Sequence, residues 1–532
     1  MIPPSLKASI KRGERLGAEE RFDAIVVGSG AAGGLACLKL CEGGLNVLLL
    51  DAGMNTSIRK RPFTTATQFL TRVAANSPLA FRLARPVARL AQRALRAVGK
   101  LRQPIQTQCF AWERMPQAFV DDRDYPYATP SGRPFSWIRT HSLGGRMIVP
   151  GHGWQYYRLA QTDFRPASPH RPAWPITLED LTPWYEDVET LLGLSGREDG
   201  FSCPPDSLIS RRIDPDALEA RLMAGVRLRW PQSNIMMSRF APPKASIALA
   251  AATGRLTCRT GAVVERILPD DSGRAGGAEW RDKRDGVLRS SRAPIIFLCA
   301  STIESTRILM ASSTPDGRRP GEDSGVLGAN LTDRIIVRAE GVINDTHHPV
   351  APPPGRCLAL PRFDLRDGGA GKERGYGVQL YTYPSGRSSF FTAVAFIEGS
   401  PRVSNHIRVT PDKGGSPVGL EIDYSYNEDD LKLTDEAASA LRELGKSLGA
   451  VLTHVDTVPS TPGVSIHECG TARMGTDRQT SVLNPYNECW DMPGLFVTDG
   501  ASFPSQGSQN PALTIMALTA RACQHVLDKR AA

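Results

Sequence analysis

Three glycines near the start of the chain have the spacing that binds the pyrophosphate of a dinucleotide. Gly28, Gly30 and Gly33 follow a short apolar run and open a helical stretch. The first glycine permits a tight turn, the second lets the backbone approach the phosphates, and the third allows close packing of the helix, whose N-terminus attracts negative charge. A second apolar run ends in Asp51, whose carboxylate would accept hydrogen bonds from ribose hydroxyls. We therefore predict a βαβ unit with these cofactor-binding residues: Gly28, Gly30, Ala31, Ala32, Gly33 and Asp51.

The fingerprint alone does not choose between NAD and FAD, because both dinucleotides bind such units. No second glycine fingerprint follows another strand-like run. Flavoenzymes that are reduced by NAD(P)H usually carry a second unit. A single unit therefore indicates either an NAD enzyme or a flavoenzyme that its own substrate reduces.

The C-terminal segment carries polar groups suited to acid–base chemistry. His467 opens the sequence HECGTARMG, and Asn510 lies in GSQNPALT. An imidazole accepts a proton near neutral pH, whereas an amide orients an oxygen without titrating. Each residue also has a plainer interpretation, as a hydrogen-bonded loop histidine and as the cap of a helix that begins at Pro511. A metal pair of His467 with Cys469 finds no further ligands at suitable spacing, so we predict no metal site.

Together these motifs resemble the glucose-methanol-choline (GMC) oxidoreductases. The resemblance extends over nearly the whole chain and includes LGGR at 143–146, ASTIES at 300–305, GANLTD at 328–333 and TDGASFP at 498–504. It implies FAD as the cofactor, bound non-covalently, since the Thr-His-x-Trp pattern of covalently flavinylated relatives is absent. It also implies further cofactor contacts, from Gly144, Gly145, Val264, Asp499, Gly500, Pro511 and Ala512.

By the same resemblance, His467 is the base that takes the proton of a substrate hydroxyl, while Asn510 holds that oxygen and hydride passes to flavin N5. A helix that begins at Pro511 would aim its positive end at the flavin ring. The chain departs from the family at two positions. Arg146 stands where many relatives have a small hydroxyl residue, which leaves the re-oxidation side of the flavin open, and Arg334 stands where they often have histidine.

The C-terminal motifs are most similar to those of bacterial sugar-oxidising members. The resemblance thus implies an FAD-dependent oxidase or dehydrogenase that acts on the CH–OH group of a sugar, glycoside or polyol. Oxidation of a pseudosaccharide or aminoglycoside hydroxyl in antibiotic biosynthesis is an alternative. A cyanohydrin-type lyase is an alternative from another class, and a scaffold that retains FAD only for structure is a third. The electron acceptor (oxygen, a quinone or a protein), the hydroxyl attacked and the formation of a homo-oligomer stay open.

These residues need two kinds of structural element to position them. We predict an α/β fold, α+β overall, in which a Rossmann-like FAD-binding domain is interleaved with a substrate domain built on an antiparallel sheet with helices. Strand-like runs at 263–268 and 294–299 should rejoin the nucleotide-binding sheet, several runs within 335–426 should form the antiparallel sheet, and a helix should follow at about 434–452. The predicted division is an N-terminal arm at 1–20, an FAD-binding domain at 21–60, 130–170, 246–340 and 455–532, a lid or insertion at 61–129, and a substrate-binding domain at 171–245 and 341–454.

Composition limits the remaining choices. The 532 residues are 41% hydrophobic and 22% charged, which is typical of a globular protein, and no apolar run approaches the ~18 residues of a spanning helix. The first residues lack the pattern of a signal peptide, and the ten cysteines form no CxxC pair, so we expect a reducing, cytoplasmic location. The net charge of +9 comes without a nucleic-acid-binding motif. An amphipathic basic helix at 82–100 is interpreted as a solvated or subunit-packing face, with peripheral membrane association as the alternative.

Overall fold

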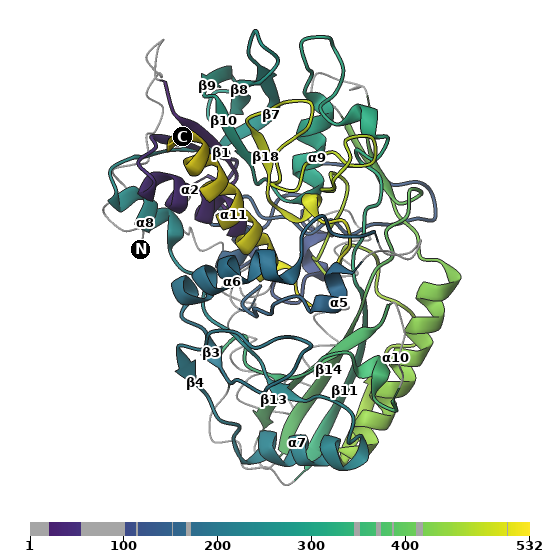
Figure 1. Ribbon diagram of the computed structural model, residues 1–532. Helices are drawn as coiled ribbons and strands as arrows, with labels where there is room; N and C mark the ends of the chain where they lie inside the picture. Colours follow the sequence, from purple (N-terminus) through teal and green to yellow (C-terminus); the bar gives the residue numbers. More distant parts are fainter. Residues whose placement is uncertain are drawn as a thin grey trace.

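The computed structural model describes residues 21–54, 102–112, 115–149, 151, 153–165, 172–344, 352–368, 374–385, 388–410, 419–507 and 509–531. The arm predicted at 1–20 and the basic helix predicted at 82–100 lie outside these residues. A parallel sheet with its helices forms one end of the molecule, and an antiparallel sheet flanked by one long helix forms the other (Figure 1).

The first sheet is parallel and carries the glycine fingerprint. Its spatial order is β18 (Leu495–Val497), β10 (Ile295–Leu298), β1 (Ala24–Val27), β2 (Val47–Asp51) and β6 (Leu256–Thr260). Every residue of β1 and β2 is buried, as expected for parallel strands that have helices on both faces. The helices packed around it include α2 (Ala31–Glu42), α6 (Leu178–Leu192), α8 (Ser246–Ala252) and α11 (Ala512–Ala531). This arrangement confirms the predicted Rossmann-like unit.

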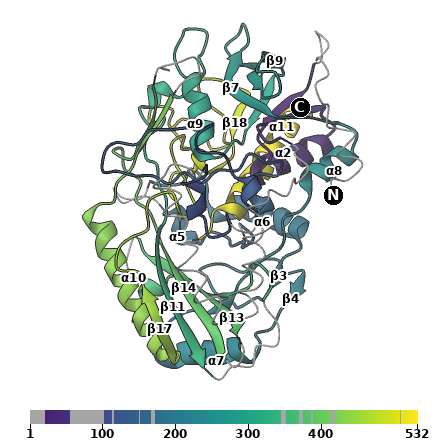
Figure 2. The same ribbon diagram turned by 180° about the vertical axis from the view of Figure 1, so that it is seen from behind.

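The second sheet is antiparallel over most of its width and forms the opposite end of the molecule (Figure 2). Its spatial order is β17 (Ala450–Val455), β11 (Ile335–Asn344), β14 (Ser388–Ile397), β13 (Tyr376–Ser385), β12 (Leu358–Leu360) and β5 (Met236–Met237). The apolar face of α10 (Glu428–Ser447) packs on β11, β14 and β17, and α7 (Ala217–Arg229) contacts α10. The predicted substrate-side sheet is therefore present.

Two strand assignments from the sequence were wrong about the partner. The run at 294–299 joins the parallel sheet as β10, but the run at 263–268 does not. It is β7 (Ala262–Pro269), which forms a separate three-stranded antiparallel sheet with β8 (Ala275–Asp282) and β9 (Leu288–Arg292). The runs at 407–410 and 420–424 likewise pair with each other, as β15 (His406–Thr410) and β16 (Gly419–Asp423), and not with the six-stranded sheet. A strand's own pattern specifies which faces are buried and does not name its neighbour.

The helix predicted at about 434–452 begins and ends earlier. Asn427 caps α10 by accepting a hydrogen bond from the backbone N–H of Asp430, whose carboxylate bonds back to the backbone of Asn427 in a capping box. The helix ends at Ser447, before the left-handed Gly449, and the residues after it form β17. The predicted helix therefore wrongly included the first residues of β17.

The remaining elements connect the two ends. They are α5 (Gln161–Phe164), α9 (Thr302–Ala311), β3 (Ser195–Gly196), β4 (Arg211–Arg212) and the 3₁₀ turns η1 (Gln106–Gln108), η3 (Pro116–Ala118), η4 (Gly145–Ile148), η5 (Glu322–Ser324), η6 (Phe363–Leu365) and η7 (Gly500–Ser502). The helix predicted after β10 is α9. β11 begins at Ile335, just before the boundary predicted at 340, and belongs to the six-stranded sheet. The domain boundaries themselves stay predictions.

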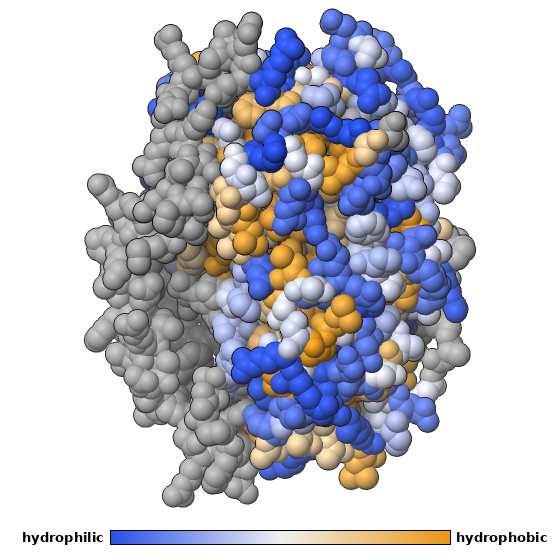
Figure 3. All heavy atoms as spheres, turned by 60° about the vertical axis from the view of Figure 1, so that its left-hand side comes forward, coloured by the Kyte–Doolittle hydropathy of each residue, from blue (hydrophilic) through white to orange (hydrophobic). Residues whose placement is uncertain are grey.

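The surface mixes hydrophobic and hydrophilic residues. On the face shown in Figure 3, hydrophobic residues lie in several patches between hydrophilic ones. In the part of the chain that the structure describes, no helix has both the length and the hydropathy needed to cross a bilayer.

Candidate active site

The fingerprint turn has the shape that a phosphate-binding loop requires. Gly28 has a φ of +87°, and a Cβ on it would lie 2.5 Å from the carbonyl oxygen of Cys299. A Cβ on Gly33 would lie 1.9 Å from the carbonyl oxygen of Gly28, so this position also excludes a side chain. Around Gly30, by contrast, a Cβ would meet nothing within 4 Å. Two glycines are thus required by packing, and the one between them faces open space at the N-terminus of α2.

A second glycine pair from a distant part of the chain lies on this turn. The backbone N–H of Gly144 donates to the hydroxyl of Ser29 at 2.8 Å. A Cβ on Gly145 would lie 3.0 Å from the Cα of Gly30, and Gly144 and Gly145 have φ values of +96° and +59°. Two backbone segments without side chains therefore face each other across the helix N-terminus. This cradle fits the pyrophosphate of FAD, which needs close backbone approach and the positive end of a helix.

Asp51 lies at the end of β2, where the ribose contact is predicted. Its carboxylate accepts hydrogen bonds from the hydroxyl of Ser29 and from the N–H of Gly53, the latter at 2.6 Å. Burial raises the pKa of Asp51, while these hydrogen bonds and the charge of Lys283 oppose the increase. A carboxylate has about four lone-pair sites, so it can still accept ribose hydroxyls. Lys283, which lies 2.9 Å from Nδ1 of His141, is a cation that the sequence interpretation missed.

Val264, the residue predicted to contact adenine, lies in β7. Its backbone carbonyl accepts a hydrogen bond of 2.8 Å from the guanidinium of Arg307 on α9. The structure thus places Val264 where α9 meets the three-stranded sheet. The adenine contact stays a prediction.

Asp499 and Gly500, predicted to contact the ribityl chain and pyrophosphate, form a buried junction. The carboxylate of Asp499 accepts the backbone N–H groups of Ser301 and Ala501, each at 3.0 Å, and the hydroxyl of Ser305. Burial raises the pKa of Asp499 to about 6. A Cβ on Gly500 would lie 2.6 Å from the carbonyl oxygen of Glu468. The pair therefore joins the end of β18 to the start of α9 and to the His467 segment, while its contact with the cofactor stays a prediction.

His467 is held from both sides by backbone hydrogen bonds. Its N–H donates to the carboxylate of Asp333 at 3.1 Å, and its carbonyl accepts the side-chain amide of Gln506 at 2.7 Å. The imidazole lies against Phe396 of β14, with the ring centroids 5.7 Å apart. Ile466, directly before it, has a positive φ of 60°. The loop thus presents the imidazole toward the antiparallel sheet.

Asn510 is buried where the C-terminal segment enters α11. Its amide nitrogen lies 3.4 Å from the side-chain oxygen of Gln155. The guanidinium of Arg334 donates to the carbonyls of Gly507 and Gln509, at 2.8 and 2.5 Å. The helix α11 begins at Ala512 and not at Pro511 as predicted, so Pro511 takes the position directly before the helix and Asn510 lies one residue further out. The interpretation of Asn510 as the helix cap was therefore wrong by one residue.

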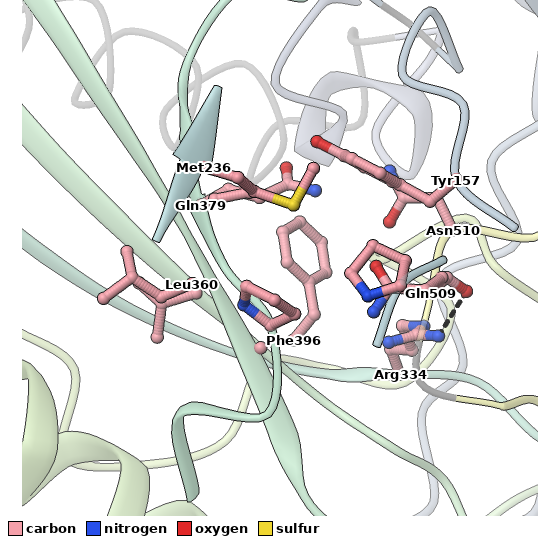
Figure 4. Close-up of a pocket in the computed structure, with 13 residues that line it drawn as sticks. Tyr157, Met236, Arg334, Leu360, Gln379, Phe396, Gln509 and Asn510 are labelled. Atoms are coloured by element: carbon pink, nitrogen blue, oxygen red, sulfur yellow. Dashed lines mark hydrogen bonds between the residues drawn. The ribbon is translucent and has the colours of Figure 1, made fainter. Parts of the chain in front are cut away.

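Asn510 lines a pocket between the two ends of the molecule (Figure 4). The antiparallel sheet contributes one wall, and the C-terminal segment contributes the other. The lining residues drawn and labelled in Figure 4 are Tyr157, Met236, Arg334, Leu360, Gln379, Phe396, Gln509 and Asn510. His467 reaches this pocket through its contact with Phe396. The two residues predicted to be catalytic are therefore brought to one region.

A charged contact links the cofactor cradle to the His467 segment. Arg146, directly after the glycine pair, donates to the buried carboxylate of Glu468 at 3.0 Å, and its guanidinium also lies 3.4 Å from the hydroxyl of Ser301. Glu468 follows His467 in the chain. Arg146, one of the two residues at which the chain departs from the family pattern, thus connects the glycine cradle with the His467 segment.

Comparison with known proteins agrees with this arrangement. The family model described as GMC oxidoreductase matches residues 401–519, which include His467 and Asn510. The C-terminal part of the chain is thus similar to the GMC oxidoreductases. The chain is 28% identical to 2-methyl-1,2-propanediol dehydrogenase of Mycolicibacterium austroafricanum, over 78% of this chain and 85% of that protein. It is 24% identical to paromamine 6'-oxidase of Streptomyces fradiae, over 95% and 91%.

Among solved structures, the GMC fold is matched by pyridoxine 4-oxidase from Mesorbium loti. The TM-score is 0.62 at 19% sequence identity, over 94% of this chain and 98% of that structure. This likeness shows the fold. The family-model match and these relatives bear out the predicted class of enzyme, an oxidoreductase, and imply a flavin, which the glycine cradle fits.

Sequence interpretation missed the residues that contact the two side chains predicted to be catalytic. Asp333, Arg334, Gln506 and Gln155 each bond to His467, to Asn510 or to the segment before it. The only signal for Arg334 was its departure from the family pattern, and Gln155 lies in a region without clear periodicity. In the described residues, no group of three or more His, Cys, Asp and Glu side chains could hold a metal ion.

Proposed function

We propose that the chain is an FAD-dependent oxidoreductase that oxidises a CH–OH group of a sugar, glycoside or polyol, with FAD bound non-covalently. The observation that carries the proposal is the contact between the glycine cradle and the segment of His467. The hydrogen bond from Arg146 to Glu468 places the segment of His467 beside the glycine cradle, and Asn510 lines the adjoining pocket. A reacting carbon held in the pocket is then close to both catalytic groups and to the cofactor site.

The residues of the chain supply the proton chemistry. His467 accepts the proton of the substrate hydroxyl through its imidazole. An asparagine amide has two N–H donors, so Asn510 can bond to Gln155 with one and hold the substrate oxygen with the other. Bound FAD supplies the acceptor for the hydride that leaves the carbon. Burial of Asn510 limits the access of water to its amide.

The pocket wall favours a neutral polar substrate. Its sides combine apolar groups from the sheet, such as Leu360 and Phe396, with the polar groups of Tyr157 and Gln379. Arg334 is the charged group among the lining residues, and it would repel an ammonium group. A relative named for the aminosugar paromamine keeps the aminoglycoside alternative open. The pocket charge favours a neutral sugar, glycoside or diol over such a polycation.

The proposal extends to the location of the protein. None of the ten cysteines, all of which lie in the described residues, forms a disulfide, and nine of them are buried. Unpaired thiols fit a reducing compartment, so we place the enzyme in the cytoplasm, with a quinone, oxygen or a redox protein as electron acceptor. Recovery of the native protein in a membrane or extracellular fraction would contradict this placement.

The test is anaerobic. Purified protein with bound FAD is mixed with a panel of neutral sugars, glycosides, diols, aminoglycosides and a cyanohydrin, and the flavin absorbance near ~450 nm is followed. Bleaching by a neutral sugar, glycoside or polyol is the expected result. Bleaching by aminoglycosides alone would support the alternative, and cleavage of the cyanohydrin without bleaching would support the lyase. Release of FAD on denaturation in acid would establish that it is not covalently bound.

A further inference from the structure

Two consecutive residues contact both catalytic loops. Asp333 and Arg334 lie directly before β11, and both are almost completely buried. The carboxylate of Asp333 accepts the N–H groups of Gly463 and His467, at 2.7 and 3.1 Å, and the hydroxyl of Ser465. Every one of these donors belongs to the His467 loop.

The next side chain contacts the other loop. One nitrogen of the Arg334 guanidinium, Nη2, donates to the carbonyls of Gly507 and Gln509, and Figure 4 shows the contact with Gln509, directly before Asn510. The two N–H groups of this nitrogen are fixed in the guanidinium plane, whereas the N–H groups of a lysine ammonium rotate, so arginine holds the two carbonyls in a fixed arrangement. Its backbone N–H also bonds to the hydroxyl of Ser465, at 3.1 Å.

The segment that carries this pair is itself fixed. Thr332 and Cys469 exchange both backbone hydrogen bonds, at 2.9 Å each, which ties the segment to the His467 loop. On the other side, Ile335 starts β11 and pairs with Ile397 of the antiparallel sheet. Asp333 and Arg334 are neighbours in the chain, so their Cα atoms lie about 3.8 Å apart. The residue that contacts the His467 loop is thus directly bonded to the residue that contacts the Asn510 loop.

We propose that Asp333 and Arg334 are a positioning pair that sets the distance between the imidazole of His467 and the amide of Asn510. Asp333 fixes the loop of the base, and Arg334 fixes the loop of the amide. This inference rests on the proposed function, in which those two groups act on one substrate oxygen. The geometry favours arginine at position 334, because lysine keeps the charge and loses the two N–H donors that are fixed in the guanidinium plane.

The first experiment measures the loops directly by hydrogen–deuterium exchange of the FAD-bound protein, without substrate. Arg334→Lys should raise exchange in 505–512 about tenfold and leave 463–470 within twofold, and Asp333→Asn should do the reverse. Arg239→Lys is the matched control, because Arg239 is a buried guanidinium that donates to the carbonyl of Pro205 and to the carboxylate of Asp206, both outside the two loops. Equal exchange in both loops for all variants would overturn the proposal.

The second experiment is a double-mutant cycle on the rate of anaerobic flavin reduction at saturating substrate. Arg334→Lys should slow reduction about 100-fold, as expected for a displacement of roughly 1 Å, with FAD affinity within threefold of wild type. In an Asn510→Ala background the same change should have an effect below threefold, since the amide to be positioned is absent. A merely structural role would slow both backgrounds equally and would contradict the proposal.

A second double-mutant cycle measures the effect of Asp333→Asn on the rate of flavin reduction, in wild type and in a His467→Ala background. It tests the positioning pair even if Arg334→Lys does not retain FAD. The effect of Asp333→Asn should disappear when the imidazole is absent, and equal slowing in both backgrounds would overturn the proposal. Failure of the wild type to be reduced by any substrate would instead contradict the proposed function. The exchange experiment would still judge the positioning pair in that case.

Discussion

The two sheets of the molecule build their parts of the site by opposite means. At the parallel sheet the atoms proposed to contact the cofactor belong to the backbone. Packing leaves no room for a side chain at Gly28 and Gly33, and the space beside Gly30 is open. At the antiparallel sheet the important atoms belong to side chains, such as Gln379 and Phe396, that stand on one face of neighbouring strands. The shape of the first end therefore tolerates few substitutions at its glycines, while side chains at the second end can be exchanged without a change in the backbone.

The largest expected effect tests the backbone side of this comparison. In Gly33→Ala the new Cβ would lie 1.9 Å from the carbonyl oxygen of Gly28, so the fingerprint turn must open. We expect FAD affinity to fall at least ~100-fold, about 2.7 kcal/mol, together with a lower melting temperature. Fluorescence titration with FAD and thermal unfolding measure the two effects. Retention of FAD with wild-type affinity would show that the cradle is elsewhere.

Gly30→Ala separates the cofactor from the fold. Its Cβ meets nothing within 4 Å, so the apoprotein should melt within about 1 °C of wild type. A pyrophosphate that approaches the backbone there would meet the methyl group, and the dissociation constant for FAD should rise about tenfold. An unchanged dissociation constant would contradict the placement of the pyrophosphate beside this residue.

Tyr157→Phe tests the side-chain side. The buried hydroxyl of Tyr157 lines the pocket, whereas Tyr156, next to it, is buried in the core on the other side of the chain. Loss of a hydrogen bond to a neutral substrate costs about 1 kcal/mol, so kcat/KM for a polar substrate should fall about fivefold in Tyr157→Phe, with FAD affinity unchanged. Tyr156→Phe is the control and should leave kcat/KM unchanged. Equal losses in the two variants would argue against a substrate contact.

The smallest expected effect concerns the junction between the two ends. Burial raises the pKa of Asp499 to about 6, above its unfolded value near 3.8, so the native state binds the proton more tightly and stability increases as pH falls through 6. Between pH 7 and 5 this carboxyl should contribute about 1 kcal/mol, and Asp499→Asn should remove that part of the slope. Carboxyls with a lowered pKa, such as Asp316 at about 2, act only below pH ~4. Chemical unfolding of the apoprotein at several pH values measures the slope. Identical slopes in the two proteins would contradict the assigned pKa.

The same contrast explains how much the sequence could predict. The fingerprint, β1, β2, β10 and α9 were predicted because local patterns of glycines and apolar residues dictate local backbone geometry. The partner of β7 was not predictable from such patterns, because its pairing with β8 depends on a hairpin and not on its own residues. The start of α10 was predicted too late, because the prediction relied on helical periodicity alone. The capping box of Asn427 and Asp430 was the signal in the sequence that would have located it.

In the site, the sequence indicated residues that could bear chemistry and missed those that contact them. Motifs indicated His467 and Asn510; Asn510 lines the pocket, and His467 lies against Phe396, which lines it too. Arg334 and Gln155 act through contacts with residues more than 150 positions away, and no spacing in the sequence encodes such contacts. Arg334 was visible only as a departure from the family pattern.

The central claim is that the two ends meet so that His467 and Asn510 act on one substrate hydroxyl beside the flavin. Its most direct test is rapid anaerobic mixing of the FAD-bound protein with a substrate from the panel, in wild type and in His467→Ala. We predict rapid bleaching in wild type, and deuterium on the reacting carbon should slow it severalfold. In His467→Ala the rate should be at least ~1000-fold lower, with FAD still bound. Equally fast bleaching in both proteins would contradict it.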